Sequence, residues 1–288
     1  MEYFIHLAII IAIYIILSVG LNLVVGYTGL LSITHAAFYG LGAYAATLLT
    51  MRAGLNFFVA LPVAVIITAA ISLLIGLVLS KFRDDYYALV ALGFNVIVFS
   101  VLLNWQKLTH GPLGIAGIPR PRLGSFVFQN NFWFLLLTIA LAILVYLGAR
   151  YITRSSLGRV LRAIREDETA AQVFGYNTKY FKLTIFVISA GMAAVAGALF
   201  ATYITFIEPA AFTVDESIFI LALTILGGLA NLRGSVLGAV IMMLLPELLR
   251  FVGMPDDIAA QMRQVIYGVI LVALMFYRPQ GLWGEYRL

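Results

Sequence analysis

Residues 155–175 read SSLGRVLRAIREDETAAQVFG and form a charged segment in a chain that is otherwise built from long apolar runs. From Leu157 to Ile164, the apolar residues recur at the i, i+3, i+4, i+7 spacing of one helical face, and the arginines fall on the other faces. The segment is therefore predicted to be an amphipathic helix that lies outside the membrane. Its density of charge indicates that it contacts a soluble partner.

The rest of the composition is that of a helical integral membrane protein. The 288 residues are 63% hydrophobic and 11% charged, with a mean hydropathy of +1.03, whereas soluble domains carry about 25% charged residues. We expect an all-α polytopic bundle of about nine spans, with a range of eight to ten, in a single transmembrane domain over residues 1–288. The predicted spans are 4–25, 35–51, 57–79, 86–104, 132–151, 180–206, 216–229, 234–252 and 263–277.

The basic residues orient these spans, because loops on the cytoplasmic side carry an excess of lysine and arginine. With the connection 150–182 placed inside, around a cytoplasmic loop at 153–179, twelve of the eighteen lysines and arginines fall on the inner side. The N-terminus is then outside and the C-terminus inside. The net charge of +5 is spread over loops, so nucleic acid is not an expected partner, whereas membrane lipid is.

Two glycine-containing junctions predict broken or re-entrant segments. Gly26-Tyr27-Thr28-Gly29 interrupts the first apolar stretch, and a similar junction covers residues 226–239. Irregular backbone at membrane depth must be buried in protein or line a water-filled cavity, and in transporters such breaks build the substrate path. A tight turn between two helices explains the first junction equally well. Packing of small residues between helices is the favoured interpretation of the second.

Polar side chains inside apolar spans are energetically expensive and usually face the bundle interior or a cavity. The candidates for a translocation path are Asn22, Tyr27, Thr28, Ser32, His35 and Asn95. Two alternatives stay open: His35 can be a packed histidine bonded to a carbonyl, and Asn95 can form a hydrogen bond between helices.

The motifs of enzymes and metal proteins are missing from the sequence. It has no G-x-x-x-x-G-K-[ST], no G-x-S-x-G and no H-E-x-x-H, its three histidines lie in different segments, and it has no cysteine. We therefore expect no enzyme activity, no metal site and no cofactor bound by this chain.

The acidic residues bear on the source of energy for a transporter. Ion-coupled carriers often use carboxylates inside the membrane. Residues 207–217 are expected to form a short outward loop, and each of the acids outside the charged segment is expected at or near the end of a span. Among these acids, the four that bear on this point are Glu208, Asp215, Glu216 and Glu247, and none of the four is expected at the centre of a span. This placement disfavours a self-contained ion-coupled carrier.

The charged segment resembles the cytoplasmic loop of branched-chain amino acid ABC transporter permeases of the LivM type, through Gly158-Arg159, the run from Leu161 to Glu168 and Ala170-Ala171. Leu30 departs from the family pattern, which has glutamine after Gly-Tyr-Thr-Gly. Further matches are Gly20-Leu21-Asn22-Leu23, Gly26-Tyr27-Thr28-Gly29, Ser32, His35-Ala36-Ala37-Phe38, Gly40-Leu41-Gly42-Ala43-Tyr44, Tyr87-Ala88-Leu89-Val90, Gly111-Pro112, Gly117-Ile118-Pro119, Gly227-Gly228-Leu229, Pro246-Glu247 and Arg278-Pro279-Gln280-Gly281-Leu282.

The resemblance implies a permease subunit of an importer in a bacterial or archaeal cytoplasmic (inner) membrane. Its implied partners are a LivH-like second permease, two cytoplasmic ATPase subunits that use ATP, and a periplasmic or lipid-anchored substrate-binding protein. The implied ATPase-coupling residues are Arg159, Arg162, Arg165, Glu166, Asp167, Glu168 and Gly175. An Arg162–Glu166 pair within the helix, or a helix lying on anionic lipid, is the alternative role for this segment. Urea or another small amide is the alternative to leucine, isoleucine and valine as substrate.

Overall fold

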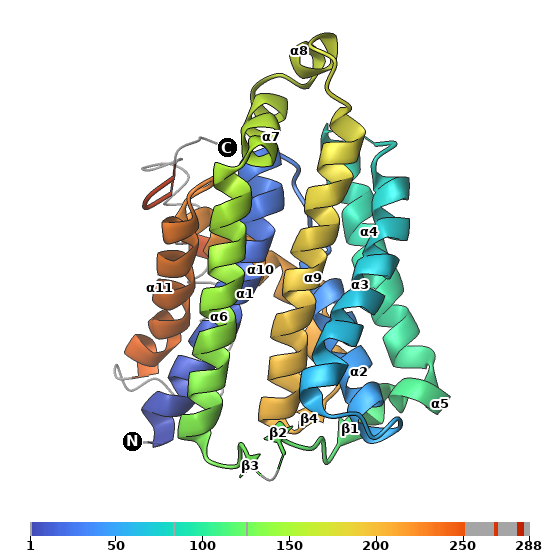
Figure 1. Cartoon of the computed structure of the whole chain (residues 1–288), viewed down its shortest axis with the longest axis vertical. Coiled ribbons are helices and arrows are strands. Elements are labelled where there is room, and N and C mark those ends of the chain that lie inside the picture. Colours follow the sequence, from blue (N-terminus) through green and yellow to red (C-terminus); the bar gives the residue numbers. More distant parts are fainter. Residues whose placement is uncertain (1, 83, 125, 251–267, 270–280, 285–288) are drawn as a thin grey trace.

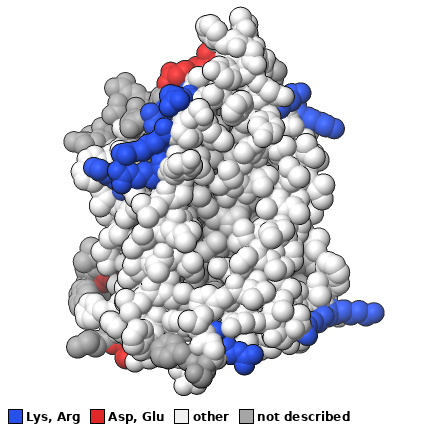
Figure 2. Space-filling view, viewed as in Figure 1, with Lys and Arg blue, Asp and Glu red and all other residues white. Residues whose placement is uncertain are grey.

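A computed structural model describes residues 2–82, 84–124, 126–250, 268–269 and 281–284. The long helices stand side by side in an elongated bundle, and two short helices of the charged segment project from one end (Figure 1). The N-terminus lies at the opposite end. We call the end with the charged helices the cytoplasmic end and the other the outer end. On the face drawn in Figure 2, lysine and arginine side chains gather towards these two ends.

Five helices in the described part of the chain are long and apolar enough to cross a membrane. They are α1 (Glu2–Thr28), α3 (Phe57–Leu79), α4 (Asp84–Asn104, apolar from Tyr86), α6 (Asn131–Arg154) and α9 (Thr178–Ile204). The pair formed by α10 (Val214–Gly227) and α11 (Leu232–Arg250) is bent by 120° and raises the number to six if it is counted as one span.

The expected count of nine spans is therefore not confirmed, although the helical membrane fold is. One reason is α2 (His35–Met51), whose 17 residues measure about 25 Å at 1.5 Å per residue, less than the roughly 30 Å of a hydrocarbon core. The other is the bend between α10 and α11, because the sequence assigned a span to each of them. Apart from residues 268–269, the predicted span 263–277 lies outside the described residues.

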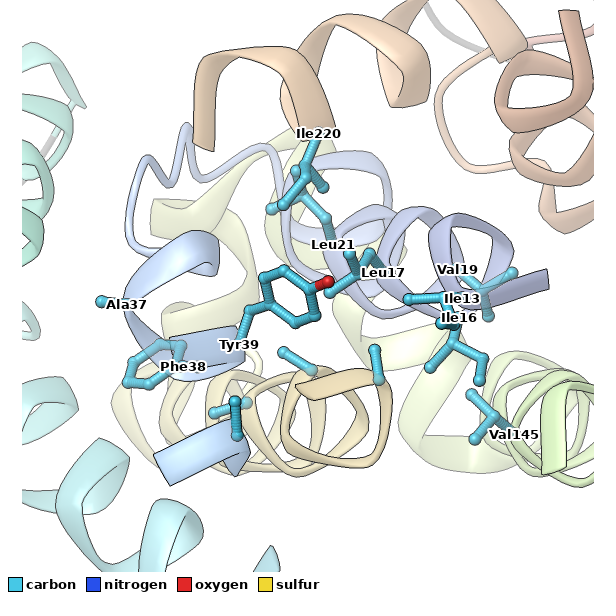
Figure 3. Packing of buried hydrophobic residues seen from close by; sticks show 14 of the residues in the cluster. Ile13, Ile16, Leu17, Val19, Leu21, Ala37, Phe38, Tyr39, Val145 and Ile220 are labelled. Carbon is cyan, nitrogen blue, oxygen red and sulfur yellow. The ribbon is translucent and has the colours of Figure 1, made fainter. Parts of the chain in front are cut away.

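Helix α1 occupies the interior of the bundle, and α6, α9, α10 and α11 pack around it. Figure 3 shows the packing of its buried side chains, among them Ile13, Ile16 and Leu17, against residues from the other helices. The apolar side chains exposed on the bundle surface lie mainly on α3, α4 and α6, for example Ile66, Leu89 and Leu144. These faces suit contact with acyl chains, because a bilayer solvates apolar side chains.

The first break lies later in the chain than predicted. Helix α1 runs through Gly26 and Tyr27 to Thr28, and the helical backbone is lost only over residues 29–34, starting at Gly29 with φ of +75°. Gly26 has a packing role instead: a Cβ there would lie 2.5 Å from the backbone nitrogen of Ala230. Gly26 thus marks the place in α1 where the chain around Ala230 comes close to the helix backbone.

Short elements close the outer end. They are α5 (Gln106–Thr109), η1 (Gly111–Leu113), β1 (Ile115–Ala116), β2 (Arg122–Leu123), β3 (Phe126–Val127), β4 (Phe206–Ile207) and η2 (Pro209–Phe212). The strands β1 and β4 pair antiparallel, as do β2 and β3. The β1–β4 pair joins the loop after α4 to the end of α9, and η2 then leads the chain back into the bundle, because Phe212 packs on Tyr39 of α2.

Helices α2 and α9 approach each other through glycine, and this contact gives a stability prediction. A Cβ at Gly197 would lie 2.1 Å from the carbonyl oxygen of Tyr39, so we expect Gly197→Ala to lower the free energy of unfolding by about 1–3 kcal/mol, the usual cost of overpacking. The matched control is Gly93→Ala in α4, where an added Cβ meets nothing within 4 Å. Unfolding in mixed micelles with increasing SDS measures both. Equal stability of the two variants would contradict the prediction.

Candidate functional site

The charged segment folds into α7 (Ser156–Glu166) and α8 (Glu168–Val173), which project beyond the ends of α6 and α9 (Figure 1). The amphipathic helix is confirmed, because Val160, Leu161 and Ile164 are buried on one face of α7. Asp167 separates the two helices. Its Oδ1 accepts a hydrogen bond from the backbone nitrogen of Ala170 at 2.9 Å, so it caps α8.

Two predicted coupling residues hold α7 against the last turn of α1. Arg165 Nη1 donates hydrogen bonds to the carbonyl oxygens of Val25, at 3.2 Å, and Gly26. The last carbonyls of a helix lack partners within it and carry partial negative charge, so a guanidinium stabilises them. The Arg162 guanidinium lies over the Tyr27 ring, 5.4 Å from its centroid. Helix α7 is therefore bound to α1 directly before the 29–34 break.

Glu168 fixes α8 to the beginning of α9. Its Oε2 pairs with Lys182 Nζ at 2.6 Å, and its Oε1 accepts a hydrogen bond from Thr178 Oγ1 at 2.9 Å. The remaining predicted coupling residues face outwards, since Arg159, Glu166, Asp167 and Gly175 are exposed. Gly175 follows α8 with φ of +87°, a left-handed conformation that glycine adopts without strain. The predicted set thus divides into a bound half and an exposed half.

The tip of this projection carries an apolar patch that the sequence analysis did not single out. Val173 is 83% exposed and Phe174 81% exposed, and Tyr176 and Tyr180 lie exposed beside them in the chain. The signal in the sequence that could have revealed this patch is a valine and a phenylalanine in the middle of a polar, charged loop. We call these four residues the apolar tip. Exposed apolar residues rimmed by charge are typical of a protein contact.

A polar node lies halfway through the membrane-spanning part of the bundle. Asn95, close to the midpoint of α4, donates through Nδ2 to the carbonyl oxygen of Ile33 at 3.0 Å and to Ser217 Oγ at 2.5 Å. Ser217 Oγ also accepts a hydrogen bond from the backbone nitrogen of Ala36 at 2.9 Å. The node thus joins the 29–34 break, the beginning of α2, the middle of α4 and the first turns of α10. Irregular backbone here lies at membrane depth, so the first junction is more than a tight turn at the surface.

Asn22 holds the second break in place. The α10–α11 connection approaches α1 here, and Asn22 Nδ2 donates to the carbonyl oxygens of Gly228, at 3.2 Å, and Asn231, at 3.1 Å, and to Ser235 Oγ at 2.5 Å. Its Oδ1 accepts from the backbone nitrogen of Ala230 at 3.0 Å. Asn22 therefore replaces the backbone hydrogen bonds that the break removes, which buried backbone at membrane depth requires.

The other path candidates lie at two levels. Ser32 and His35 are near the node: Ser32 Oγ is 2.9 Å from Thr34 Oγ1, and the His35 ring lies against Gly20 of α1. Tyr27 and Thr28 lie at the cytoplasmic end of α1, where Thr28 Oγ1 donates to the carbonyl oxygen of Val24 at 2.6 Å. The structure thus brings Ser32, His35 and Asn95 together and places Asn22, Tyr27 and Thr28 nearer to the cytoplasmic end.

The expected position of the carboxylates is wrong for Glu216 and Asp215. Helix α10 begins inside the bundle and not at the outer surface, and both acids belong to its first turn. Glu216 Oε1 accepts a hydrogen bond at 2.7 Å from the hydroxyl of Tyr14, which is halfway along α1. The physical reason is that η2 leads the chain back into the bundle. The mixed composition of residues 207–217 did not indicate this return. Among the described residues, no three His, Asp or Glu side chains are grouped to hold a metal ion.

Comparison with known proteins identifies the family. A sequence-family model described as branched-chain amino acid transport system / permease component matches residues 3–275. The chain belongs to this family. It is 37% identical to the high-affinity branched-chain amino acid transport system permease protein LivM of Escherichia coli (strain K12) and 38% identical to LivM of Salmonella typhimurium, in each case over 94% of this chain and 67% of the relative.

The second permease type of such systems is also a relative. LivH of Escherichia coli (strain K12) is 26% identical over 94% of this chain and 91% of LivH. No solved structure matches the chain. The family consists of transport permeases, so this chain is a multi-pass membrane protein and not an enzyme.

Proposed function

We propose that this chain is a transmembrane permease subunit of an ABC importer for leucine, isoleucine and valine in a bacterial or archaeal cytoplasmic membrane. The observation that supports it most is the 37–38% identity to LivM permeases over nearly the whole chain. A LivH-like chain is the second permease, two cytoplasmic ATPase subunits supply the energy, and a binding protein delivers the amino acid. All 288 residues form one permease domain.

The 153–179 loop is the contact with an ATPase subunit. The apolar tip enters a groove on that subunit, and Arg159, Glu166 and Asp167 form its charged rim. A helix lying on lipid is disfavoured because the acidic run 166–168 would be repelled by an anionic leaflet. Within α7, Arg162 stacks on Tyr27, and in the described structure it forms no ion pair with Glu166.

Movement of the ATPase subunits reaches the membrane through the contact between α7 and α1. A displaced α7 carries the last turn of α1 with it, because Arg165 and Arg162 hold the two helices together. The 29–34 break follows that turn and ends at the polar node. We place Ser32, His35 and Asn95 along the path, and we assign Asn22, Tyr27 and Thr28 to the support of the two breaks.

Reconstitution tests this function. The chain is co-expressed with LivH-like, ATPase and binding-protein partners from the same genome, and leucine uptake is measured in vesicles with and without ATP. We expect uptake that requires ATP, the binding protein and both permeases. Gradient-driven uptake by this chain alone would contradict the proposal and indicate an ion-coupled carrier. ATP-dependent uptake of urea without leucine uptake would keep the mechanism and change the substrate.

Arg165 offers a test of the transmission step. Replacement by methionine keeps an unbranched apolar stem and removes both hydrogen bonds to α1. We expect Arg165→Met to keep binding of the ATPase subunits within about threefold and to lower uptake per ATP hydrolysed at least tenfold. Arg159→Met, at an exposed position of the same helix, is the control and should keep the ratio. An unchanged ratio in Arg165→Met would show that coupling does not run through this contact.

A further inference from the structure

A carboxylate lies at the middle of the membrane-spanning bundle, and the function proposed above leaves it without a role. The hydrogen bond from Tyr14 places Glu216 at the midpoint of α1. The next residue, Ser217, is bonded to Asn95 at the midpoint of α4. Helices α1 and α4 both run the length of the bundle. The bonds to their midpoints thus independently place the first turn of α10 at the same depth. Figure 1 shows α10 at middle height, behind α1.

The surroundings of Glu216 form a built site with an unused polar group. The Tyr39 hydroxyl of α2 has no hydrogen-bond partner in the described part of the chain, and Tyr39 is 1% exposed. Figure 3 shows this hydroxyl pointing from α2 towards Leu17 of α1. The beginning of α2 lies next to the first turn of α10, because the backbone nitrogen of Ala36, one helical turn before Tyr39, is bonded to Ser217, the neighbour of Glu216. A buried hydroxyl without a partner costs free energy, and a ligand that bonds to it removes that cost.

The exposed side of the first turn of α10 indicates what this turn faces in the assembled protein. Asp215 precedes Glu216 and is exposed on the isolated chain at this depth. A carboxylate at the middle of a bilayer is expensive against acyl chains and faces a bundle interior or a water-filled cavity. The first turn of α10 therefore faces a polar space. In an importer with two permeases, that space is the path between them.

We propose that Glu216, with the Tyr39 hydroxyl, receives the ammonium group of the amino acid at the membrane midplane, and that Asp215 lines the approach. A primary ammonium has three donors and no acceptor. The Glu216 carboxylate can accept further bonds beside the one from Tyr14, and the Tyr39 oxygen can accept one. Both acids repel the carboxylate of the substrate, so the amino acid is oriented with its ammonium towards α10. This inference rests on the proposed amino acid importer.

The first test labels the carboxyl directly in the assembled importer. Dicyclohexylcarbodiimide modifies carboxyl groups in apolar surroundings, and mass spectrometry locates the adduct. We expect label on Glu216 of the wild-type chain, protection by leucine and by leucinamide, and no protection by 4-methylpentanoate, which has the same side chain and no ammonium. Equal protection by all three, or protection by none, overturns the assignment. If Glu216 takes up no label, the uptake measurement below decides.

The second test uses a matched pair of variants. Glu247 also accepts a hydrogen bond from a tyrosine of α1, Tyr3, but near the outer end of the bundle. At saturating amounts of loaded binding protein, we expect Glu216→Gln to lower leucine uptake at least tenfold, with assembly of the complex within twofold of wild type. Glu247→Gln should change neither. Tyr39→Phe, which removes only the unused hydroxyl, should lower uptake three- to tenfold.

The outcomes separate the inference from the proposed function. If wild-type vesicles fail to accumulate leucine with ATP, the importer itself is wrong. If wild type transports and Glu216→Gln transports equally well, only the ammonium site is wrong. Parallel loss of uptake and of complex assembly in Glu216→Gln, with unchanged uptake in Tyr39→Phe, would make Glu216 a packing residue. Wild-type uptake that is abolished by a protonophore at constant ATP would make Glu216 a proton carrier.

Discussion

Replacement of Asn22 by leucine is expected to lower the free energy of unfolding by about 2–6 kcal/mol and to abolish transport. Its amide forms four hydrogen bonds to the α10–α11 break and the beginning of α11. Leucine has a similar volume, so the loss is one of bonding. The carbonyl oxygen of Gly228 and the backbone nitrogen of Ala230 would lose the partner that the described structure gives them, whereas Asn231 keeps its bond from the backbone nitrogen of Ser235. Each buried group without a partner costs about 1–3 kcal/mol.

The measurement is SDS-induced unfolding of the purified chain, together with vesicle uptake. Asn104→Leu is the matched control, since Asn104 Nδ2 donates to the carbonyl oxygen of Ser100 at 2.8 Å, at an exposed position of its own helix. We expect the control to stay within about 0.5 kcal/mol of wild type, as surface substitutions usually do. Stability equal to that of the control in Asn22→Leu would show that water or a local rearrangement satisfies the break without Asn22.

The second large effect is expected at the apolar tip. Phe174→Ser should weaken the binding of the ATPase subunits at least thirtyfold and reduce uptake in proportion, because a buried aromatic anchor typically carries 2 kcal/mol or more of an interface. Nothing else in the fold should change, since Phe174 is 81% exposed. Binding of the purified ATPase to the permease pair in lipid nanodiscs measures the effect.

Tyr151 supplies the control for this prediction. It is 79% exposed near the cytoplasmic end of α6 and lies outside the apolar tip. Tyr151→Ser should keep ATPase binding within about twofold of wild type. A Phe174→Ser permease that binds the ATPase normally would refute the docking role of α8, and an equal loss in Tyr151→Ser would move the contact towards α6.

Local patterns in the sequence were sufficient to predict several elements. The predicted spans 35–51 and 57–79 coincide with α2 and α3, because uninterrupted apolar runs flanked by polar residues define helix ends in lipid. The buried face of α7 was predicted from the 3.6-residue period alone. These features depend on residues close to each other in the chain.

The depth of α10 in the membrane could not be predicted from such local patterns. The apolar run of α10 was expected to begin at the outer surface, yet its first turn is bonded to the midpoints of α1 and α4. Two long-range contacts decide this, and no periodicity encodes them. The argument against an ion-coupled carrier from the absence of central carboxylates is therefore wrong, and the family match supports the importer instead.

The central place of α1 has a consequence for the order in which the protein folds. Tyr14, Ser18 and Asn22 form hydrogen bonds to residues of α10, the following break and α11, more than 200 positions later in the chain. During synthesis, α1 enters the bilayer long before these partners leave the ribosome. Until these partners are inserted, the polar side chains of α1 must therefore be bonded to their own helix or to water. Insertion of the helices and closure of the bundle are thus separate stages, and closure begins only when the last quarter of the chain arrives.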